Sequence, residues 1–340
     1  MITTLIRYFN LICLTLLVLV LLSFSLAFFF PGDSAVNLLG AAQIADQPLL
    51  SQAVNQSNVL VQFWYYVQAL FNGQWGVSFA TGKPLYEDIM QLFPATLELS
   101  LYAVTLALVF GIPLGFVSGL QYRKKIDHAF MSSSMVMYSF PVFWLALILI
   151  LLVSLQAQWL PMSGRLSLLY DIPHATGFIL VDIALSDIAN KQYAFHDAIS
   201  HLILPTLSVS FIAFAVFLRS TRRSVVDVVS TEYIKSAQTR GLTASNIFFK
   251  HILRNALLPV LPLLAVQIST LVTNVMIVET IFSWPGIGDW LIQAIYERDY
   301  PAIRTGIMLV AMIVVVFTLS LECLSQLIDP TRDRFAYARR

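Results

Sequence analysis

The ionisable side chains of this chain lie almost entirely at the edges of long apolar runs, which limits the chemistry they can perform. An enzyme needs titratable groups held together in one site. Glu322 is the only carboxylate set well inside an apolar run. A carboxylate at that depth is a functional candidate by default, but it has no partner of matching depth and lies a turn or two before Asp329. We therefore favour a structural role for Glu322 and predict no catalytic residue.

The chain also lacks the residue patterns for nucleotide and metal binding. No Gly-Lys-Ser or Gly-Lys-Thr occurs, so there is no phosphate-binding loop of the form G-x-x-x-x-G-K-[S/T]. His174, His196 and His201 are scattered, and the last two are five residues apart, which places them on different faces of a helix. We expect no metal site and no cofactor on this chain.

The composition is that of a membrane protein. Of the 340 residues, 58% are hydrophobic and 11% are charged, whereas about 25% of the residues of a soluble domain are charged. A bilayer core needs roughly 20 apolar residues as a helix, and six charge-free stretches meet or approach that length. They are residues 8–30, 99–122, 129–160, 202–218, 255–278 and 305–321. We predict an all-α protein with six transmembrane helices, the third of them near 131–155.

The first stretch is either a signal peptide or an uncleaved anchor. It is longer than the roughly 7–15 residues of a signal core, and bulky residues 28–31 replace a small-residue cleavage site, so an anchor is favoured. The distribution of Lys and Arg between loops then sets the orientation. With the N-terminus inside, the inner segments carry fifteen basic residues and the outer segments five. Both termini are therefore expected in the cytoplasm.

This topology divides the chain into a first helix (1–30), a periplasmic segment (31–98), a five-helix core (99–328) and a cytoplasmic tail (329–340). Leu60, Phe63, Trp64, Val67 and Phe71 recur with helical spacing, which predicts a helix over 59–71 within the periplasmic segment. The outer segments carry thirteen acidic residues against five basic ones. This excess follows from the orientation bias alone, or it forms a negative entrance that concentrates a cationic solute.

Three glycines mark one face of the second stretch. Gly111, Gly115 and Gly119 recur at four-residue spacing, with Pro113 between them. Small residues on one face let helix backbones approach closely. Two interpretations remain at this point, which are packing within the chain's own bundle and an interface beside a translocation path.

The most polar inner segment, 219–258, lies between two spans and predicts a rigid knob of two short helices. Thr231 is positioned to cap the first helix, with Glu232 in its first turn, and Gly241 is positioned to end it. Thr243 or Ser245 starts the second helix. That helix would carry an apolar stripe of Ile247, Phe248, Ile252 and Leu253, and the chain would pass into the next span at Pro259 and Pro262.

The segment Y-I-K-S-A-Q-T-R-G-L at 233–242, with R-N-A-L-L-P at 254–259, resembles the cytoplasmic coupling loop of ABC importer permeases. That loop has the motif E-A-A-x-x-x-G and then Leu-Pro. Ala237 and Gly241 match it, whereas Lys235 and Ser236 replace its first Glu and Ala, a departure similar to the dipeptide and oligopeptide branch.

Other segments are similar to permeases of the same branch, and together they cover most of the chain. They are F-P-A-T-L-E-L-S at 93–100, G-I-P-L-G at 111–115, F-P-V-F-W-L-A-L at 140–147, L-P-M-S-G-R at 160–165, H-L-I-L-P at 201–205, E-T-I-F-S-W-P-G-I-G at 279–288 and R-D-Y-P at 298–301. The stretch T-G-F-I-L-V-D at 176–182 is most similar to the first permease subunit of the Sap transporters, named for sensitivity to antimicrobial peptides.

The resemblance implies a type I importer permease in the bacterial inner membrane, surrounded by lipid and without a nucleic-acid partner. Its expected partners are a second permease chain, two ATPases that bind ATP and Mg²⁺, and a periplasmic binding protein. It implies that the ATPase contact is made by Tyr233, Ser236, Ala237, Gly241 and Leu242. For the apolar and aromatic members of this set, packing of the loop on the chain's own spans is the alternative.

The resemblance also implies the substrate class. Peptides, including cationic or antimicrobial peptides, are the expected substrate. Dipeptides, nickel, haem or a polyamine are alternative substrates of the same machine, and a membrane scaffold or sensor that transports nothing is the alternative of a different class. No substrate-binding residue is predicted.

Overall fold

The computed structural model describes residues 2–29, 58–188 and 190–328, and the regular elements within those ranges are all helices, joined by loops, with one isolated β-bridge between Val77 and Pro84. The predicted all-α class is confirmed. In chain order, the elements are α1 Ile2–Phe29, α5 Val59–Phe71, α6 Leu85–Leu120, α7 Lys125–Ser139, α8 Val142–Leu149 with the π-helical segment η1 Ile150–Gln156, α9 Ile179–Leu185, α10 Lys191–Val229, α11 Glu232–Thr239, α12 Ala244–Asn246 with the π-helical segment η2 Ile247–Ile252, α13 Leu253–Leu257, α14 Leu261–Phe282, α15 Ile287–Glu297 and α16 Tyr300–Ile328.

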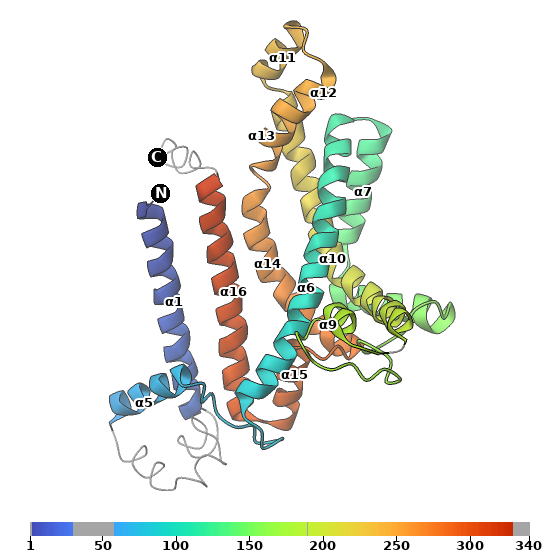
Figure 1. Ribbon diagram of the computed structural model, residues 1–340. Coiled ribbons are helices and arrows are strands. Elements are labelled where there is room, and N and C mark those ends of the chain that lie inside the picture. The colour runs from blue at the N-terminus through green and yellow to red at the C-terminus, as the bar shows by residue number, and fades with distance from the viewer. Residues whose placement is uncertain (1, 30–57, 189, 329–340) are drawn as a thin grey trace.

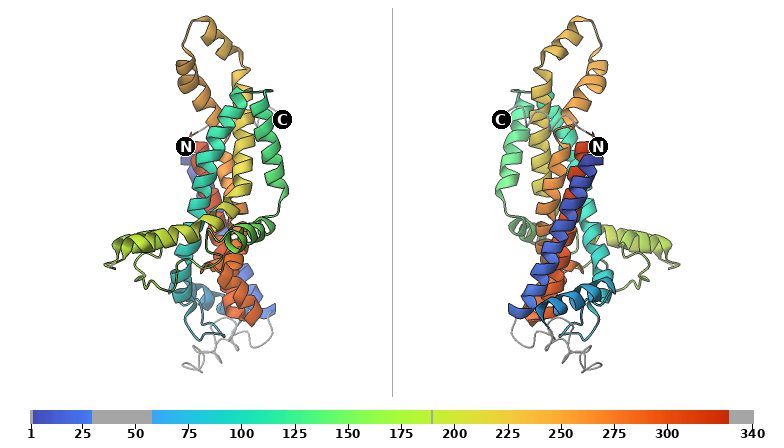
Figure 2. Two further views of the ribbon diagram at one scale, coloured as in Figure 1. Left: turned by 90° about the vertical axis from the view of Figure 1, so that its right-hand side faces the viewer. Right: turned by 90° about the vertical axis from the view of Figure 1, so that its left-hand side faces the viewer.

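Among the described residues, five helices are individually long and apolar enough to span a membrane. Two bent pairs pass the same test together, so the number of spans lies between five and seven. The predicted number of six falls within this range. Figure 1 shows the long helices side by side, with α11 and α12 projecting at one end, which we term the knob end. The end that carries α5 and α15 is the far end. The first part of α10 projects sideways from the bundle (Figure 2).

The prediction of one helix over 131–155 is wrong, because the chain turns sharply at Pro141. A residue before proline is disfavoured in the α conformation, and Phe140 is extended, with φ −88° and ψ 129°. The axis turns by 98° between α7 and the α8–η1 segment. The transition that Pro259 and Pro262 mark lies between α13, which ends at Leu257, and α14, which begins at Leu261.

Several helices extend beyond their apolar runs. α6 begins at Leu85 instead of residue 99, because Leu85 and Ile89 are fully buried against α15 and α16. The helix predicted over 59–71 is confirmed as α5. The last residue of the predicted first helix (30), the first part of the predicted periplasmic segment (31–57) and the predicted tail (329–340) lie outside the described residues.

The glycine face of α6 packs directly on α10 of the same chain. A Cβ atom at Gly111 would lie 3.0 Å from the Phe217 Cβ, and one at Gly115 would lie 2.6 Å from the Thr221 Cβ. At Gly119 the corresponding neighbour is Val225, also at 2.6 Å. The partners repeat every four residues, so the two helices run parallel with their backbones in close approach. Of the two interpretations of the glycines, packing within the chain's own bundle is therefore the one that the structure supports.

We predict that Gly115→Ala weakens the bundle. The added Cβ would also meet the Leu218 carbonyl oxygen at 2.7 Å, and backbone cannot rotate away as a side chain can. Overpacking of this kind costs typically 1–3 kcal/mol. The free energy of unfolding in mixed micelles measures the effect. Val117→Ala is the control, because Val117 lies in the same helix and is 43% exposed. This substitution should change the free energy of unfolding little. Equal stability of the two variants would contradict the close approach.

Candidate functional site: the knob and its seat

The knob, residues 231–252, is built from α11, α12 and η2. Thr231 occupies the N-cap position of α11 as predicted, but its hydroxyl donates a hydrogen bond to the Val228 carbonyl at 2.6 Å and does not cap the helix. Thr243 starts the second helix and accepts the Asn246 N–H at 3.4 Å. Of the two predicted starts, Thr243 and Ser245, the structure uses Thr243.

Gly241 ends α11 as the sequence predicts. The Leu242 N–H donates to the Ala237 carbonyl at 3.3 Å, and the Gly241 N–H donates to the Gln238 carbonyl at 3.0 Å. These two bonds form a Schellman motif, which places its penultimate residue in the left-handed region. Gly241 has φ +74°, a conformation that costs an L-residue roughly 1–2 kcal/mol. A Cβ at this position would meet nothing within 4 Å, so the requirement for glycine here is conformational.

The five residues predicted to contact an ATPase do not share one environment. Tyr233, Ser236, Gly241 and Leu242 are exposed at the knob surface. Ala237 is only 6% exposed and belongs to the hydrophobic core of the knob. This burial favours the packing alternative for Ala237. A bulky charge placed there would disrupt the knob itself.

A small hydrophobic core fixes the knob to the long helices. Ile234 and Ile247, from the two helices of the knob, pack together with Phe116 of α6 and Val225 of α10. The same cluster includes Ala237, Ile252 and Ala256. Since fully buried aliphatic side chains each contribute roughly 1.5–3 kcal/mol, the knob is packed onto α6 and α10 as one body.

Tyr233 forms two hydrogen bonds across the knob that the sequence did not reveal, which we term the Tyr233 bracket. Its hydroxyl donates to the His251 carbonyl at 2.9 Å and accepts the Asn255 Nδ2–H at 2.6 Å. These bonds join α11 to the segment that leads into α13. The role of Tyr233 within the chain is thus to hold the two sides of the knob together, while 41% of its surface remains exposed.

An ion pair at the root of the knob forms what we term the seat. Arg222 of α10 donates from Nε to Asp127 Oδ1 at 3.0 Å and from Nη2 to Oδ2 at 2.8 Å. The Ser118 hydroxyl and the Arg123 N–H donate to the same carboxylate at 2.7 and 2.9 Å. Asp127 is 1% exposed, and its four hydrogen bonds tie α6, α7 and α10 at one point. Two-pronged Arg–carboxylate contacts fix orientation as well as distance.

Four of the acidic residues expected on the outer side are buried within the fold. Glu279 is fully buried at the end of α14 and accepts the N–H groups of Gly288 and Asp289 at the start of α15, at 2.7 and 3.3 Å. Glu98 is also fully buried and pairs with Arg165, whose Nε donates at 3.1 Å. Asp182 and Asp299 are 3% and 2% exposed. Four of the acids counted toward a negative entrance are therefore absent from the surface.

The stretch 176–182 folds into a closed loop around Asp182. The N–H and hydroxyl of Thr176 donate to Oδ1 at 2.6 and 2.7 Å, and the Gly177 N–H donates to Oδ2 at 2.9 Å. Burial alone would raise the pKa of Asp182, but these hydrogen bonds together hold the pKa below its ordinary value. The carboxylate is thus kept ionised as a structural anchor.

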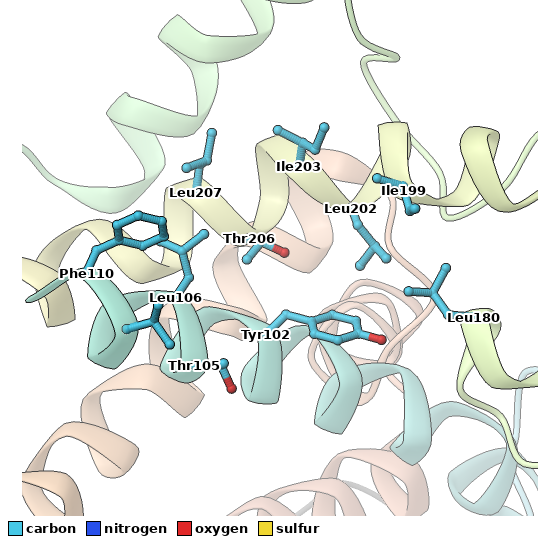
Figure 3. A pocket seen from close by; sticks show the side chains of 11 residues that line it. Tyr102, Thr105, Leu106, Phe110, Leu180, Ile199, Leu202, Ile203, Thr206 and Leu207 are labelled. Carbon is cyan, nitrogen blue, oxygen red and sulfur yellow. The ribbon is translucent and has the colours of Figure 1, made fainter.

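A groove of about 410 Å³ runs between α6, α9 and α10 (Figure 3). Tyr102, Leu106, Phe110, Leu180 and Thr206 lie around it, and Figure 3 shows their side chains converging from the three helices. The lining contains no charged residue. Since a peptide presents charged termini, this groove lacks the groups to bind one by its ends, and the described structure adds no substrate residue to the prediction.

A membrane bundle of this kind, with a packed knob projecting from two of its long helices, is the architecture of a transport permease. Residues 111–334 match the family described as the binding-protein-dependent transport system inner membrane component. The chain belongs to this family, which consists of permease subunits of ABC transporters and not of their catalytic subunits. The predicted family and branch are confirmed.

Three relatives cover nearly the whole chain. The di/tripeptide transport system permease protein DppB of Pseudomonas aeruginosa is 41% identical over 91% of this chain and 92% of its own length. The putrescine export system permease protein SapB of Escherichia coli K12 is 38% identical, over 98% of each chain. The dipeptide transport system permease protein DppB of the same strain is 34% identical, over 97% and 98%.

We predict that Asp127→Ala destabilises the protein by about 3 kcal/mol or more, because it leaves the Arg222 guanidinium without its carboxylate. The exposed pair Lys235–Glu232, whose side chains are 60% and 86% exposed, offers a matched control. Glu232→Ala removes an ion pair that is worth roughly 0.3–0.5 kcal/mol.

Free energies of unfolding in mixed micelles, combined with hydrogen–deuterium exchange over residues 218–230, compare the two variants. Asp127→Ala should also speed exchange at the root of the knob. Similar stability and similar exchange in both variants would show that the Asp127–Arg222 pair does not stabilise the contact between α7 and α10.

Proposed function

We propose that this chain is one of two permease subunits of an ATP-driven peptide transporter, and that its knob receives the motion of an ATPase. The main support for this proposal is the packing of the knob onto α6 and α10 through its own hydrophobic core. A flexible loop would dissipate a push from a soluble partner. A packed knob transmits that push to the membrane helices, and so biases a two-state equilibrium between inward- and outward-facing permease.

The charge distribution supports a cytoplasmic knob and cytoplasmic termini in the bacterial inner membrane. Arg123, Lys124 and Lys125 follow α6 at the knob end, and Arg219, Arg222 and Arg223 lie in the last turns of α10. Positive residues accumulate on the cytoplasmic side of membrane proteins. In this orientation, two ATPases with ATP and Mg²⁺ would dock on the cytoplasmic side, against the exposed Ser236 and Leu242. A periplasmic binding protein would meet the far end.

Peptides are the substrate class that the relatives support best, because two of the three described above are named for di- or tripeptides. A polyamine exporter is the second candidate, since SapB of Escherichia coli K12 is named for putrescine export. A close relative in another strain, Escherichia coli O157:H7, is named for peptide transport at the same 38% identity. Uptake of labelled dipeptides and of putrescine into proteoliposomes, each driven by ATP, separates the two substrates and the direction.

Ser236→Arg tests coupling without disturbing the fold of the knob. Ser236 is exposed on α11 and donates no side-chain hydrogen bond that an arginine would break in the described structure. We expect the transporter to assemble and its uptake per ATP hydrolysed to fall roughly tenfold, within the range of ordinary coupling free energies.

The same substitution at Ser230 is the matched control. Ser230 is exposed at the base of the knob, between α10 and α11, and Ser230→Arg should leave coupling unchanged. Normal coupling in Ser236→Arg, with ATPases bound, would remove the proposed role of the knob.

The scaffold alternative makes a different prediction about partners. We expect the chain, purified from native membranes in mild detergent, to carry a second permease and ATPase subunits, identifiable by mass spectrometry of the intact complex. Gly241→Ala, which strains the left-handed turn, should reduce the bound ATPase. Purification of the chain without any ATPase, under conditions that retain other membrane complexes, would favour a scaffold.

A further inference from the structure

Helix α5 is an apolar helix outside the predicted spans. No charged residue occurs between Asp46 and Lys83, a stretch that contains the whole of α5. Within α5, Leu60, Trp64 and Phe71 are 75%, 60% and 88% exposed. Three large hydrophobic side chains left open on one short helix form an apolar surface that water alone would not favour.

The helix is held firmly across the far ends of α1 and α16. The Tyr66 hydroxyl shares a 2.8 Å hydrogen bond with the Ser23 hydroxyl of α1 and donates to the Met308 sulfur of α16 at 3.6 Å. Arg304 of α16 lies over the Tyr66 ring, 5.0 Å from its centroid. Phe24 of α1 packs edge-on to Phe63 with centroids 5.3 Å apart. Figure 1 shows α5 crossing the end of α1 and extending sideways from it.

The orientation of α5 is the reverse of that of a helix lying on a protein in water. Its buried face is formed by Gln62, Tyr66 and Ala69. At 100° per residue, Leu60, Trp64 and Phe71 fall together on the opposite side. The polar Gln68 and Asn72, both exposed, lie along one edge of that side. The most apolar surface of the helix therefore points away from the protein.

The surface of α5 continues into that of α1 and into an apolar crevice below it. α1 exposes Leu14, Leu17 and Leu21 along its length, as a membrane-spanning helix does. A crevice of about 240 Å³ between α1, α5 and α16 is lined almost entirely by apolar side chains, with no charged residue. Val67, Leu70 and Phe71 of α5 are among its lining residues.

We propose that α5 lies in the membrane, at the lipid–water interface of the far leaflet, with Leu60, Trp64 and Phe71 among the acyl chains. Lipid is the occupant that fits, because the surface is continuous with α1, carries no charge and places Trp64 and Tyr65 where aromatic belts form. Interfacial helices sink their apolar face about 5–10 Å into the headgroup and acyl boundary. α5 would then fix the depth of α1 and the tilt of the α1–α16 pair. This position of α5 depends neither on the transported substrate nor on the ATPase contact.

Depth-dependent fluorescence quenching tests the proposal on the full-length chain in lipid nanodiscs. Cys13→Ser and Cys323→Ser remove the two native cysteines. Single cysteines then replace Leu60, Trp64 or Phe71 and carry a small fluorescent label, and all three positions are exposed, so the fold is not at risk. Thr81→Cys, in the exposed turn before α6, is the water-facing control, and Leu17→Cys in α1 is the lipid-facing control.

The labels on α5 should lose fluorescence to phospholipid brominated near the carboxyl end of its acyl chains, to an extent approaching that of Leu17→Cys. They should be shielded from aqueous iodide relative to Thr81→Cys. If instead all three α5 labels follow Thr81→Cys, with strong iodide quenching and no loss to brominated lipid, α5 lies in water and the proposal is overturned. In that case its apolar face is left for a protein partner.

Discussion

The close contact between α6 and α10 is the constraint on which the rest of the molecule depends. Three glycines bring the two backbones together along the knob end of both helices, and at Gly115 and Gly119 the approach is too close for a Cβ atom without a shift of the neighbouring atoms. Because the helices run parallel in fixed register, Phe116 and Val225 meet beneath the knob, and Ser118 and Arg222 meet around Asp127. The seat and the core of the knob both follow from that register.

This arrangement makes a mechanical unit out of α6, α7, α10 and the knob. The unit is held by hydrophobic packing, and the Asp127–Arg222 pair and the hydrogen bonds of Tyr233 fix how its helices are oriented relative to one another. Packed interiors transmit strain because they have few voids in which to absorb it. The pair α1 and α16 is joined to α5 by the hydrogen bonds of Tyr66 and by aromatic contacts within a separate hydrophobic cluster.

The sequence predicted what depends on local chemistry. Gly241 as the end of a helix and α5 over 59–71 follow from capping and periodicity, and both are present as predicted. The bend at Pro141 had a local signal, the proline itself, which the long apolar run obscured. Ala237, by contrast, is buried because two short helices fold onto each other, and no spacing rule reveals which face of a short polar helix turns inward.

The ion pairs were beyond sequence reasoning for a related reason. Asp127 and Arg222 are separated by 95 residues, and Glu98 and Arg165 by 67. From the sequence alone, each of these residues is a charged side chain at the edge of a membrane span, and its partner cannot be identified. Only the register of α6 against α10, and the folding of the long loop after η1, brings the partners together. Glu98 and Glu279 therefore looked like members of an acidic surface, although both are wholly buried.

The packing of the knob onto α6 and α10 implies that the knob and the α6–α7 corner move as one rigid body. Pulsed electron paramagnetic resonance on spin labels at Ser236→Cys and Lys124→Cys, in the assembled transporter with and without ATP, measures this directly. If the two parts move together, the distance distribution is single, narrow and the same in both conditions. A broad distribution, or a distance that changes with nucleotide, would mean that the knob bends on its seat, and would contradict the account.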